Sequence, residues 1–330
     1  MYSTNGTDWQ LANVPSSNSQ WHAVTYGGGK FVAVGAVGNK RVMVSDDGIT
    51  WTLHDAAAAS DWFGVTYGNG IFVAVAGAGT NRVMTSTDGE NWTAQNAAAQ
   101  NGWYAVKYAN NVFVAMAISG TNRIMTSVNG TSCTAHSGPS GANDYQWASI
   151  THTNGLFVAS AYADVSGSSA QRIMTSPDGT NWTFRTAHFG GWYAIASGDG
   201  TTVAVAPSGT HLAMSSTSSD ASVWTTQTAP SGNWFSVTYG NGMFVAVSYG
   251  GQNQIMTSGT YTLPTTPTTT IAPTTTAGSG AVASTTTTVS TVKKLSKLPE
   301  TGSSNNLFMF AVIALTLGGA VTVMRKRLLS

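Results

Sequence analysis

Hydrophobic residues in the first 260 positions fall in short runs that recur about every 42 residues. In the first complete unit, alternating apolar positions from Trp21 to Tyr26 precede a Gly-rich turn and an apolar run from Phe31 to Val34. A second turn leads to the run from Arg41 to Ser45, and an Asp-Gly turn then leads to Trp51–Thr52. The first run recurs at residues 62–67, 103–108, 147–152, 192–197 and 234–239. This internal repeat is the strongest indication of the fold.

The four runs of each unit, named A, B, C and D in chain order, have the pattern of β-strands. Short runs separated by Gly and Asn are typical of strands joined by hairpin turns, because these residues tolerate the positive φ that tight turns need. The spacing of apolar residues needed for a helical solenoid is absent from the repeats. Four strands in each unit of 40 to 45 residues are typical of a β-propeller blade. The sequence therefore predicts an all-β, six-bladed propeller over residues 1–261.

The two ends of the repeat region raise the question of how the ring closes. No clear D run follows Ser258, whereas the chain starts with a D-like run around Trp9. We expect the Trp9 run to form the outer strand of the last blade, which joins the ends and removes an open sheet edge. The alternative is seven blades. Residues 1–3 read as the end of a C run, so sequence missing upstream would supply a further blade, with residues 260–262 as a weak final D strand.

Composition changes after the repeats. Residues 262–297 are rich in Thr, Pro, Ser and Ala, which predicts a disordered, extended stalk because such sequence buries little apolar surface. Residues 298–330 begin with the pentapeptide Leu298, Pro299, Glu300, Thr301, Gly302. An apolar segment at 307–324 follows, long enough to form a transmembrane helix, and a basic cluster at 325–327 then marks the cytoplasmic side.

This order of pentapeptide, apolar span and basic tail resembles the LPXTG cell-wall sorting signal of Gram-positive surface proteins. The resemblance implies that sortase cleaves between Thr301 and Gly302 and joins Thr301 to peptidoglycan. Sortase and peptidoglycan are thus the expected partners, and the membrane is contacted only through the helix before cleavage. The first residues have neither a basic nor an apolar segment typical of an export signal. We therefore expect the natural start of the protein to lie upstream.

The charge and cysteine content exclude several classes of function. Only 8% of residues are charged, while Trp, Tyr and Phe number eleven each. Up to Tyr261 there are eight Lys and Arg against twelve Asp and Glu, a net charge of −4, which argues against nucleic-acid binding. The single cysteine, Cys133, excludes an internal disulfide framework and a Cys-based zinc site, and the six histidines show no metal-binding spacing. We expect no metal and no cofactor.

The turn between runs C and D has its own motif, Ser-x-Asp-Gly-x-x-Trp. It resembles the Asp-box, or BNR repeat, of sialidase-like propellers, although that family's box has one more residue between Asp and Gly. We expect structural roles, in which the aspartate accepts hydrogen bonds from turn amides and the tryptophan covers the blade edge. The residues concerned are Asp47, Asp88, Asp178, Trp51, Trp92 and Trp182.

Two sets of repeated side chains are candidates for ligand binding. An arginine opens run C in four units, at Arg41, Arg82, Arg123 and Arg172. Such residues lie on one face of a propeller together with the D–A loops, where arginine forks can hold carboxylate or hydroxyl groups. The alternative is that each arginine pairs within its own blade or with a neighbouring blade, as periodic residues usually do. The A-run tryptophans, among them Trp62 and Trp103, either stack on sugar rings at the channel mouth or fill the space between blades.

Catalysis of the sialidase type is less well supported than binding. That family uses a glutamate-activated tyrosine, an aspartic acid and three arginines. Here the only glutamates are Glu90, in a C–D turn, and Glu300, in the sorting signal. We therefore interpret the chain as a cell-wall-anchored propeller that binds an extracellular glycan or protein. The alternative is a secreted glycoside hydrolase of the sialidase-like type.

Overall fold

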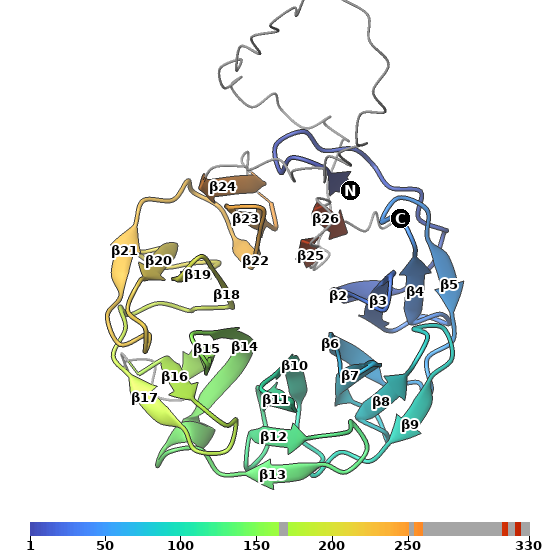
Figure 1. Ribbon diagram of the computed structural model, residues 1–330, viewed down its shortest axis with the longest axis horizontal. Coiled ribbons are helices and arrows are strands. Elements are labelled where there is room, and N and C mark those ends of the chain that lie inside the picture. The colour runs from blue at the N-terminus through green and yellow to red at the C-terminus, as the bar shows by residue number, and fades with distance from the viewer. Residues whose placement is uncertain (165–170, 251–253, 260–311, 316–320, 325–330) are drawn as a thin grey trace, which may run out of the picture.

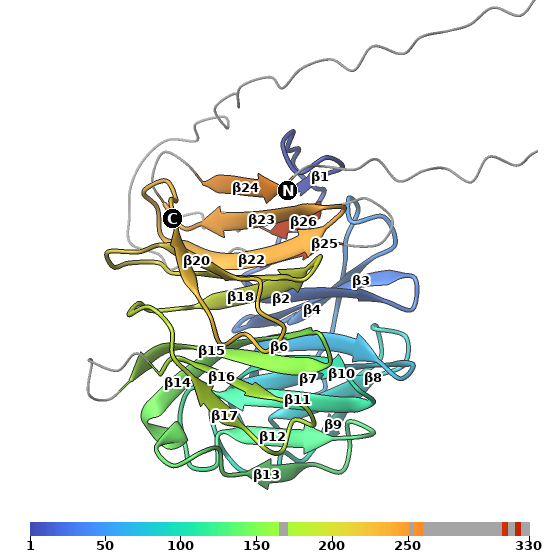
Figure 2. The ribbon, with the colours of Figure 1, turned by 60° about the vertical axis from the view of Figure 1, so that its left-hand side comes forward.

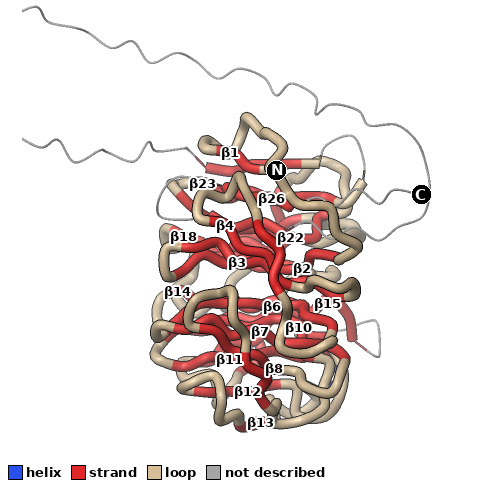
Figure 3. The backbone as a smooth tube through the Cα atoms, turned by 90° about the vertical axis from the view of Figure 1, so that its right-hand side faces the viewer, coloured by secondary structure: helices blue, strands red, loops and turns tan. Residues whose placement is uncertain are grey.

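The computed structural model describes residues 1–164, 171–250, 254–259, 312–315 and 321–324, which form a ring of radially arranged β-sheets (Figure 1). Six of the sheets are antiparallel and are built from consecutive strands, with the first strand nearest the channel and the last on the outside. After a 60° turn the strands of each blade lie side by side as one layer (Figure 2). Strands and loops make up the described chain apart from one 3-10 turn, η1 (Ala142–Asp144) (Figure 3).

Six of these sheets correspond to the six predicted repeats and confirm the six-bladed propeller. Blade 1 has strands β2 (Gln20–Gly27), β3 (Lys30–Ala36), β4 (Val42–Ser45) and β5 (Thr52–His54). Blade 2 has β6 (Asp61–Gly68), β7 (Ile71–Ala78), β8 (Val83–Ser86) and β9 (Thr93–Gln95). Blade 3 has β10 (Trp103–Ala109), β11 (Val112–Ala117), β12 (Ile124–Ser127) and β13 (Thr134–His136).

The second half of the ring follows the same order until its last blade. Blade 4 has β14 (Tyr145–Thr153), β15 (Leu156–Asp164), β16 (Ile173–Ser176) and β17 (Thr183–Arg185). Blade 5 has β18 (Ala194–Gly198), β19 (Thr201–Val205), β20 (Ala213–Ser216) and β21 (Thr225–Gln227). Within the described residues, blade 6 has three strands, β22 (Trp234–Gly240), β23 (Met243–Ser248) and β24 (Ile255–Gly259). The weak D run considered at residues 260–262 lies outside the described residues.

Two local features of the A strands shape the channel. The A–B turns contain residues with positive φ, such as Asn69 at 49° and Gly70 at 77°, which is why Asn and Gly recur there. A register shift follows the first tryptophan of most A strands, for example between Trp62 and Gly64. A β-bulge re-aims the side chain at the extra residue. The residue after the tryptophan therefore does not follow the in–out alternation of side chains along the strand.

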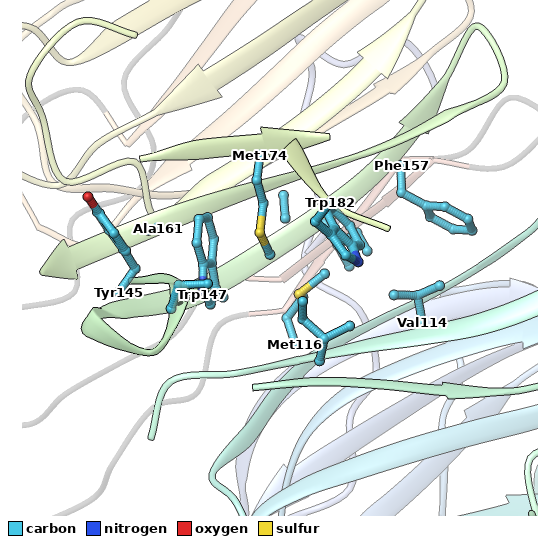
Figure 4. Close-up of a cluster of buried hydrophobic side chains, with 12 residues drawn as sticks. Val114, Met116, Tyr145, Trp147, Phe157, Ala161, Met174 and Trp182 are labelled. Atoms are coloured by element: carbon cyan, nitrogen blue, oxygen red, sulfur yellow. Dashed lines mark hydrogen bonds between the residues drawn. The ribbon is translucent and has the colours of Figure 1, made fainter. Parts of the chain in front are cut away.

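Apolar side chains from facing blades form the core. Figure 4 shows the cluster between blades 3 and 4, where Trp147 and Phe157 lie with Val114 and Met116 of the preceding blade. Five A-strand tryptophans are fully buried, and each indole N–H donates to a carbonyl of the preceding loop, as Trp103 does to Ala99 O at 2.9 Å. These tryptophans are Trp62, Trp103, Trp147, Trp192 and Trp234. Burial combined with a satisfied N–H explains why tryptophan recurs at this position.

A further sheet lies between blade 6 and blade 1, and it corrects the predicted closure. Here β1 (Tyr2–Ser3) pairs with β26 (Val321–Met324), which pairs with β25 (Val312–Leu315) (Figure 1). The Trp9 run does not extend blade 6, because the turn after Ser3 folds it back and Gln10 bridges Tyr2. Trp9 reaches blade 6 only through packing against a cluster of Met243, Val245 and Val247.

The predicted transmembrane helix is not shown. Within the described part of the chain, no helix is both long and apolar enough to cross a membrane. Of the segment 307–324, residues 312–315 and 321–324 are strands β25 and β26, and the others lie outside the described residues. The predicted stalk at 262–297 and the pentapeptide 298–302 also lie outside them.

Candidate functional site

The C–D turns have a shared hydrogen-bond pattern that uses the predicted serine, aspartate and tryptophan. In blade 1, Asp47 Oδ1 accepts hydrogen bonds from the backbone N–H groups of Ile49 and Thr50 at 2.7 and 2.8 Å. Ser45 Oγ accepts from Gly48 N at 2.8 Å, and Trp51 Nε1 donates to Gly48 O at 3.1 Å. The same bonds occur around Asp88 with Trp92 and around Asp178 with Trp182.

These aspartates are ionised because the turn holds the charged form. Hydrogen bonds from Thr50 and Ile49 lower the pKa of Asp47. Desolvation alone would raise the pKa of Asp178, but the backbone and side-chain donors of Asn181 outweigh it and lower the pKa to about 2. The same balance lowers the pKa of Asp88. A carboxylate held in this way accepts hydrogen bonds and is a poor proton donor near neutral pH.

The same turn also forms in blade 3, where asparagine replaces the aspartate, and in blade 5, where the motif is degenerate. Asn129 Oδ1 accepts from Thr131 N and Ser132 N at 3.0 and 2.9 Å in blade 3. In blade 5, where the motif is degenerate, Trp224 Nε1 still donates to the carbonyl of Ala221 at 2.8 Å. The turn therefore tolerates loss of the negative charge and, in blade 3, where Cys133 stands, also loss of the tryptophan N–H.

The repeated arginines lie where each blade meets the next. Arg82 Nε donates to Gly79 O at 3.1 Å within its own blade. Its Nη1 donates to Gln100 O and Asn101 O in the loop that enters blade 3, at 2.8 and 2.7 Å. Arg41 and Arg123 follow the same pattern, with Nη1 donating to Ser60 O at 2.6 Å and to Tyr145 O at 2.7 Å. Arg41 also lies 3.3 Å from Asp61 Oδ1. Hydrogen bonds to the protein thus occupy much of each guanidinium group.

Arg172 differs from the other three arginines in burial and in its neighbours. It is only 5% exposed, and its Nη1 donates to Tyr162 O and Gly190 O at 3.1 and 2.9 Å. Its guanidinium carbon lies 4.7 Å from the centre of the Phe189 ring. A cation over an aromatic face is attracted by the ring quadrupole. Arg172 therefore supports the loop that carries Phe189 and offers little surface to a ligand.

The two candidate tryptophans are in the core, and this corrects their assignment to a ligand site. Trp62 and Trp103 are both 0% exposed. They pack against the preceding blade, with Trp62 beside Val32 and Val34 and Trp103 beside Val73. Neither ring presents a face on which a sugar could stack.

A series of contacting aromatic side chains lies at the end where the A strands begin, and the sequence pattern did not predict it. It comes from the position directly after the A-strand tryptophan, where the β-bulge lies. Ring centroids are 4.4 Å apart for His22 and Phe63, 5.0 Å for Phe63 and Tyr104, and 4.7 Å for Tyr193 and Phe235. The Tyr104 and Tyr193 hydroxyls are hydrogen-bonded to each other. We call these five residues the aromatic mouth.

The aromatic mouth is electrically neutral at physiological pH. Burial lowers the pKa of His22 to about 4, so its imidazole is uncharged. Burial raises the pKa of Tyr104 to about 12 and also raises that of Tyr193, so both phenols keep their protons. The surface therefore combines aromatic faces with hydroxyl groups and has little attraction for charged ligands.

Blade 4 contributes no aromatic side chain at the bulge position, where Ala148 stands, but two exposed aromatic residues lie beside it. Tyr162, near the end of β15, is 40% exposed, and Phe189, in the loop before blade 5, is 55% exposed. Tyr162 continues the aromatic mouth outward, because its ring centroid is 5.3 Å from that of Tyr193. Arg172 donates hydrogen bonds to the carbonyls of Tyr162 and Gly190, the residue that follows Phe189. The mouth with these two residues is an aromatic surface that leads from the rim into the channel.

Glu90, the one glutamate among the described residues, lies in the turn after β8 and forms an ion pair with Lys30 of blade 1. Glu300 lies outside the described residues. Within the described ranges, no group of three or more His, Cys, Asp or Glu side chains is placed to hold a metal ion.

Comparison with known families identifies the C-terminal region. The LPXTG cell wall anchor motif matches residues 290–327. The predicted pentapeptide, apolar segment and basic cluster all lie in this range. The chain is therefore a sortase-anchored cell-wall protein of Gram-positive bacteria. Sortase processes the motif and attaches the chain to peptidoglycan.

Comparison with solved structures supports the propeller. The structure of a streptogramin B lyase has a TM-score of 0.63 and 14% identity, with 75% of this chain and 82% of that chain covered. Virginiamycin B lyase from Staphylococcus aureus has a TM-score of 0.60 and 12% identity, covering 76% and 88%. YCF48 bound to D1 peptide has a TM-score of 0.51 and 14% identity, covering 75% and 86%. At this identity the likeness concerns the fold alone. No curated protein matches the chain.

Proposed function

We propose that the propeller is a recognition module that binds extracellular glycans on the aromatic mouth and its rim. The observation that carries this proposal is the series of ring contacts from Tyr162 to Tyr193 and Tyr104, with the exposed Phe189 in the loop before blade 5. Pyranose rings have apolar C–H faces that pack on aromatic rings and hydroxyls that pair with phenols. Binding sites of this kind are mostly apolar, with a few polar groups that fix orientation.

The neutrality of the mouth supports a neutral ligand over an anionic one. With His22 uncharged and both phenols protonated, the mouth has no cation to attract phosphate or carboxylate groups. The arginines near this face donate to backbone carbonyls, which leaves them poorly placed as ligand forks. A neutral oligosaccharide is therefore preferred over a sialylated glycan or a nucleic acid.

Attachment to the wall makes weak binding effective. A short apolar surface binds one sugar chain weakly, but many copies on one cell wall engage a glycan-coated surface together. Adhesion through many weak contacts is the role that this arrangement supports.

The proposal is tested with residues 1–301, which end at the predicted sortase cleavage site, on an array of neutral and sialylated glycans. We expect saturable binding to a subset of neutral glycans. Phe189→Ala and Tyr162→Ala should each weaken binding about fivefold or more, because truncating a stacking aromatic residue at a hot spot costs over about 1 kcal/mol.

Tyr26→Ala provides the matched control. Tyr26 is similarly exposed, at 44%, but lies at the opposite end of its A strand, away from the mouth. It should leave glycan binding unchanged. The proposal is wrong if no glycan binds, if Tyr26→Ala weakens binding as much as Tyr162→Ala does, or if the protein releases sugar from sialosides or aryl glycosides.

A further inference from the structure

Two polar side chains depart from the repeat where blade 3 meets blade 4. The fifth position of the A run is threonine in four units, but it is Lys107 in blade 3. The sixth position is tyrosine in four units, but it is His152 in blade 4. The packing that the blades share does not account for these two residues, so they are candidates for a role of their own.

Lys107 and His152 lie on strand faces that are turned toward each other. Side chains alternate along a strand, so Lys107 shares a face of β10 with Ala105 and Ala109, which pack against the apolar cluster between blades 3 and 4. His152 shares a face of β14 with Ile150, which belongs to the same cluster. Burial and the positive charge of Lys107 both lower the pKa of His152, so the two groups interact electrostatically.

Neither side-chain nitrogen has a partner within the protein. Across the described ranges, the Lys107 ammonium takes part in no ion pair and no hydrogen bond. His152 Nε2 is buried and also has no hydrogen-bond partner there. Burial lowers the pKa of Lys107, and no carboxylate opposes this shift. Buried polar groups are nearly always hydrogen-bonded, and a desolvated charge is costly without an opposite charge, so what the pair lacks is an anionic acceptor.

The ammonium is nevertheless open to a ligand. Lys107 is half-buried, and β10 is the strand of blade 3 that lies nearest the channel (Figure 1). The equivalent Thr66 and Thr151 are buried, so the longer lysine side chain extends beyond the place that threonine occupies. Lys107 lies three residues after Tyr104, about 10 Å along the strand from the aromatic mouth. A small ligand in the channel therefore reaches Lys107 at a place distinct from the mouth.

We propose that Lys107 and His152 form a binding site for a small oxyanion, such as a carboxylate or a phosphate group, inside the channel. The ammonium supplies the positive charge and up to three donors, and the imidazole donates from Nε2–H to a second oxygen. Hydrogen bonds between ionised groups are stronger than neutral ones, and the anion offsets the unpaired charge of Lys107. This site is independent of glycan binding at the mouth, because the two use different residues of the same channel.

The experiment titrates sodium acetate and, separately, sodium phosphate into residues 1–301, with sodium chloride adjusted to keep the ionic strength constant. At ten times the dissociation constant, the melting temperature should rise by about 3–6 °C, because the anion binds only the folded state. In ¹H–¹³C spectra of the six histidine side chains, the His152 signal should move along the same saturation curve. A tighter response to acetate assigns the site to carboxylates and a tighter response to phosphate assigns it to doubly charged anions, and either result supports the proposal.

Variants of two lysines separate this site from general salt effects. Lys107→Met keeps the length of the side chain without its charge, and Lys107→Thr restores the residue of the repeat. Both should lose the acetate and phosphate responses and should melt at a higher temperature than the wild type in chloride alone, because the unpaired charge is gone. Lys40→Met is the matched control, since Lys40 is exposed and paired with Asp55 at 2.6 Å, and it should keep the full response.

A wild-type protein that is folded by circular dichroism but shows no saturable response to either anion would overturn the proposal. Retention of the response in both Lys107 variants, or its loss in Lys40→Met, would place the anion elsewhere on the protein and also overturn it. Movement of other histidine signals with His152 unchanged would have the same meaning.

Discussion

Substitution of Gly27 by alanine isolates the contact that sets the spacing between blades 1 and 2. The backbone of Gly27 has no positive φ, so alanine is allowed there on conformational grounds. The added Cβ would, however, overlap Cβ, Cγ and Cδ1 of Tyr67. These atoms are near the root of the side chain, so rotation about its outer bonds does not remove the overlap.

The cost follows from how tightly Tyr67 is held. The Phe72 ring lies on its other side, with a centroid distance of 4.7 Å, so the tyrosine has little room to retreat. Overpacking in such a place costs about 1–3 kcal/mol. For a domain of this size each kcal/mol corresponds to a fall of about 2–4 °C in melting temperature. We expect Gly27→Ala to lower the melting temperature of residues 1–301 accordingly.

Thermal or urea unfolding of four proteins checks the reasoning. Tyr67→Gly destabilises the fold by itself, but in the double variant Gly27→Ala should add almost nothing, because Cβ, Cγ and Cδ1, the atoms that the added methyl group meets, are all gone. The coupling energy should then be about 1–3 kcal/mol. Additive effects of Gly27→Ala and Tyr67→Gly would refute this account of the contact between blades 1 and 2.

Three further substitutions test other parts of the fold. Trp103→Ala should cost about 3–5 kcal/mol because it empties a fully buried site, and urea unfolding measures this. Arg82→Ala should cost about 1–2 kcal/mol through its lost hydrogen bonds and leave glycan-array binding unchanged; weaker binding at unchanged stability would return this arginine to the ligand site. Asp178→Ala should cost about 1 kcal/mol, whereas Asp178→Asn should cost little. Because folding lowers the pKa of Asp178 to about 2, its contribution is present above about pH 4 and is lost as pH falls toward 2. Unfolding at pH 7 and pH 3 should show that this loss disappears in Asp178→Asn, and an unchanged pH dependence would contradict it.

The repeat made most of the propeller predictable. A tryptophan every 40 to 45 residues, an apolar B run and an Asp-Gly turn specify strands and hairpins locally, so the six blades follow the printed sequence closely. The hydrogen bonding of Asp47, Asp88 and Asp178 likewise follows from the turn chemistry of Asp beside Gly. Where local pattern determines structure, the sequence was sufficient.

The aromatic mouth depends on geometry that the pattern does not contain. A strict alternation would place Phe63 or Tyr104 on the opposite side of the strand from the tryptophan, with no indication that they meet at the channel. The β-bulge changes their direction, and their contacts join residues as far apart as Tyr104 and Tyr193. The aromatic residue at this position in five of the six units was the available signal.

The prediction of how the ring closes was wrong for a related reason. The Trp9 run was placed on blade 6 because that blade lacks an outer strand. The turn from Ser3 to Trp9 instead folds this run onto β1 through short-range hydrogen bonds. This local turn decides where the Trp9 run lies, and the long-range pairing is made by β1 with β26 instead.

Mass spectrometry of wall fragments tests the central claim, that this propeller is displayed by sortase attachment. The protein is expressed with an export signal in a Gram-positive host that has sortase, and muramidase-released fragments are digested and sequenced. Thr301 should be the last residue of the chain, joined through its carbonyl to the peptidoglycan cross-bridge. Thr301→Ala should abolish the linkage, whereas deletion of residues 1–13 should not. Recovery of wild-type chains that end at Ser330 in the membrane fraction, with no Thr301-linked peptide in the wall, would contradict the account.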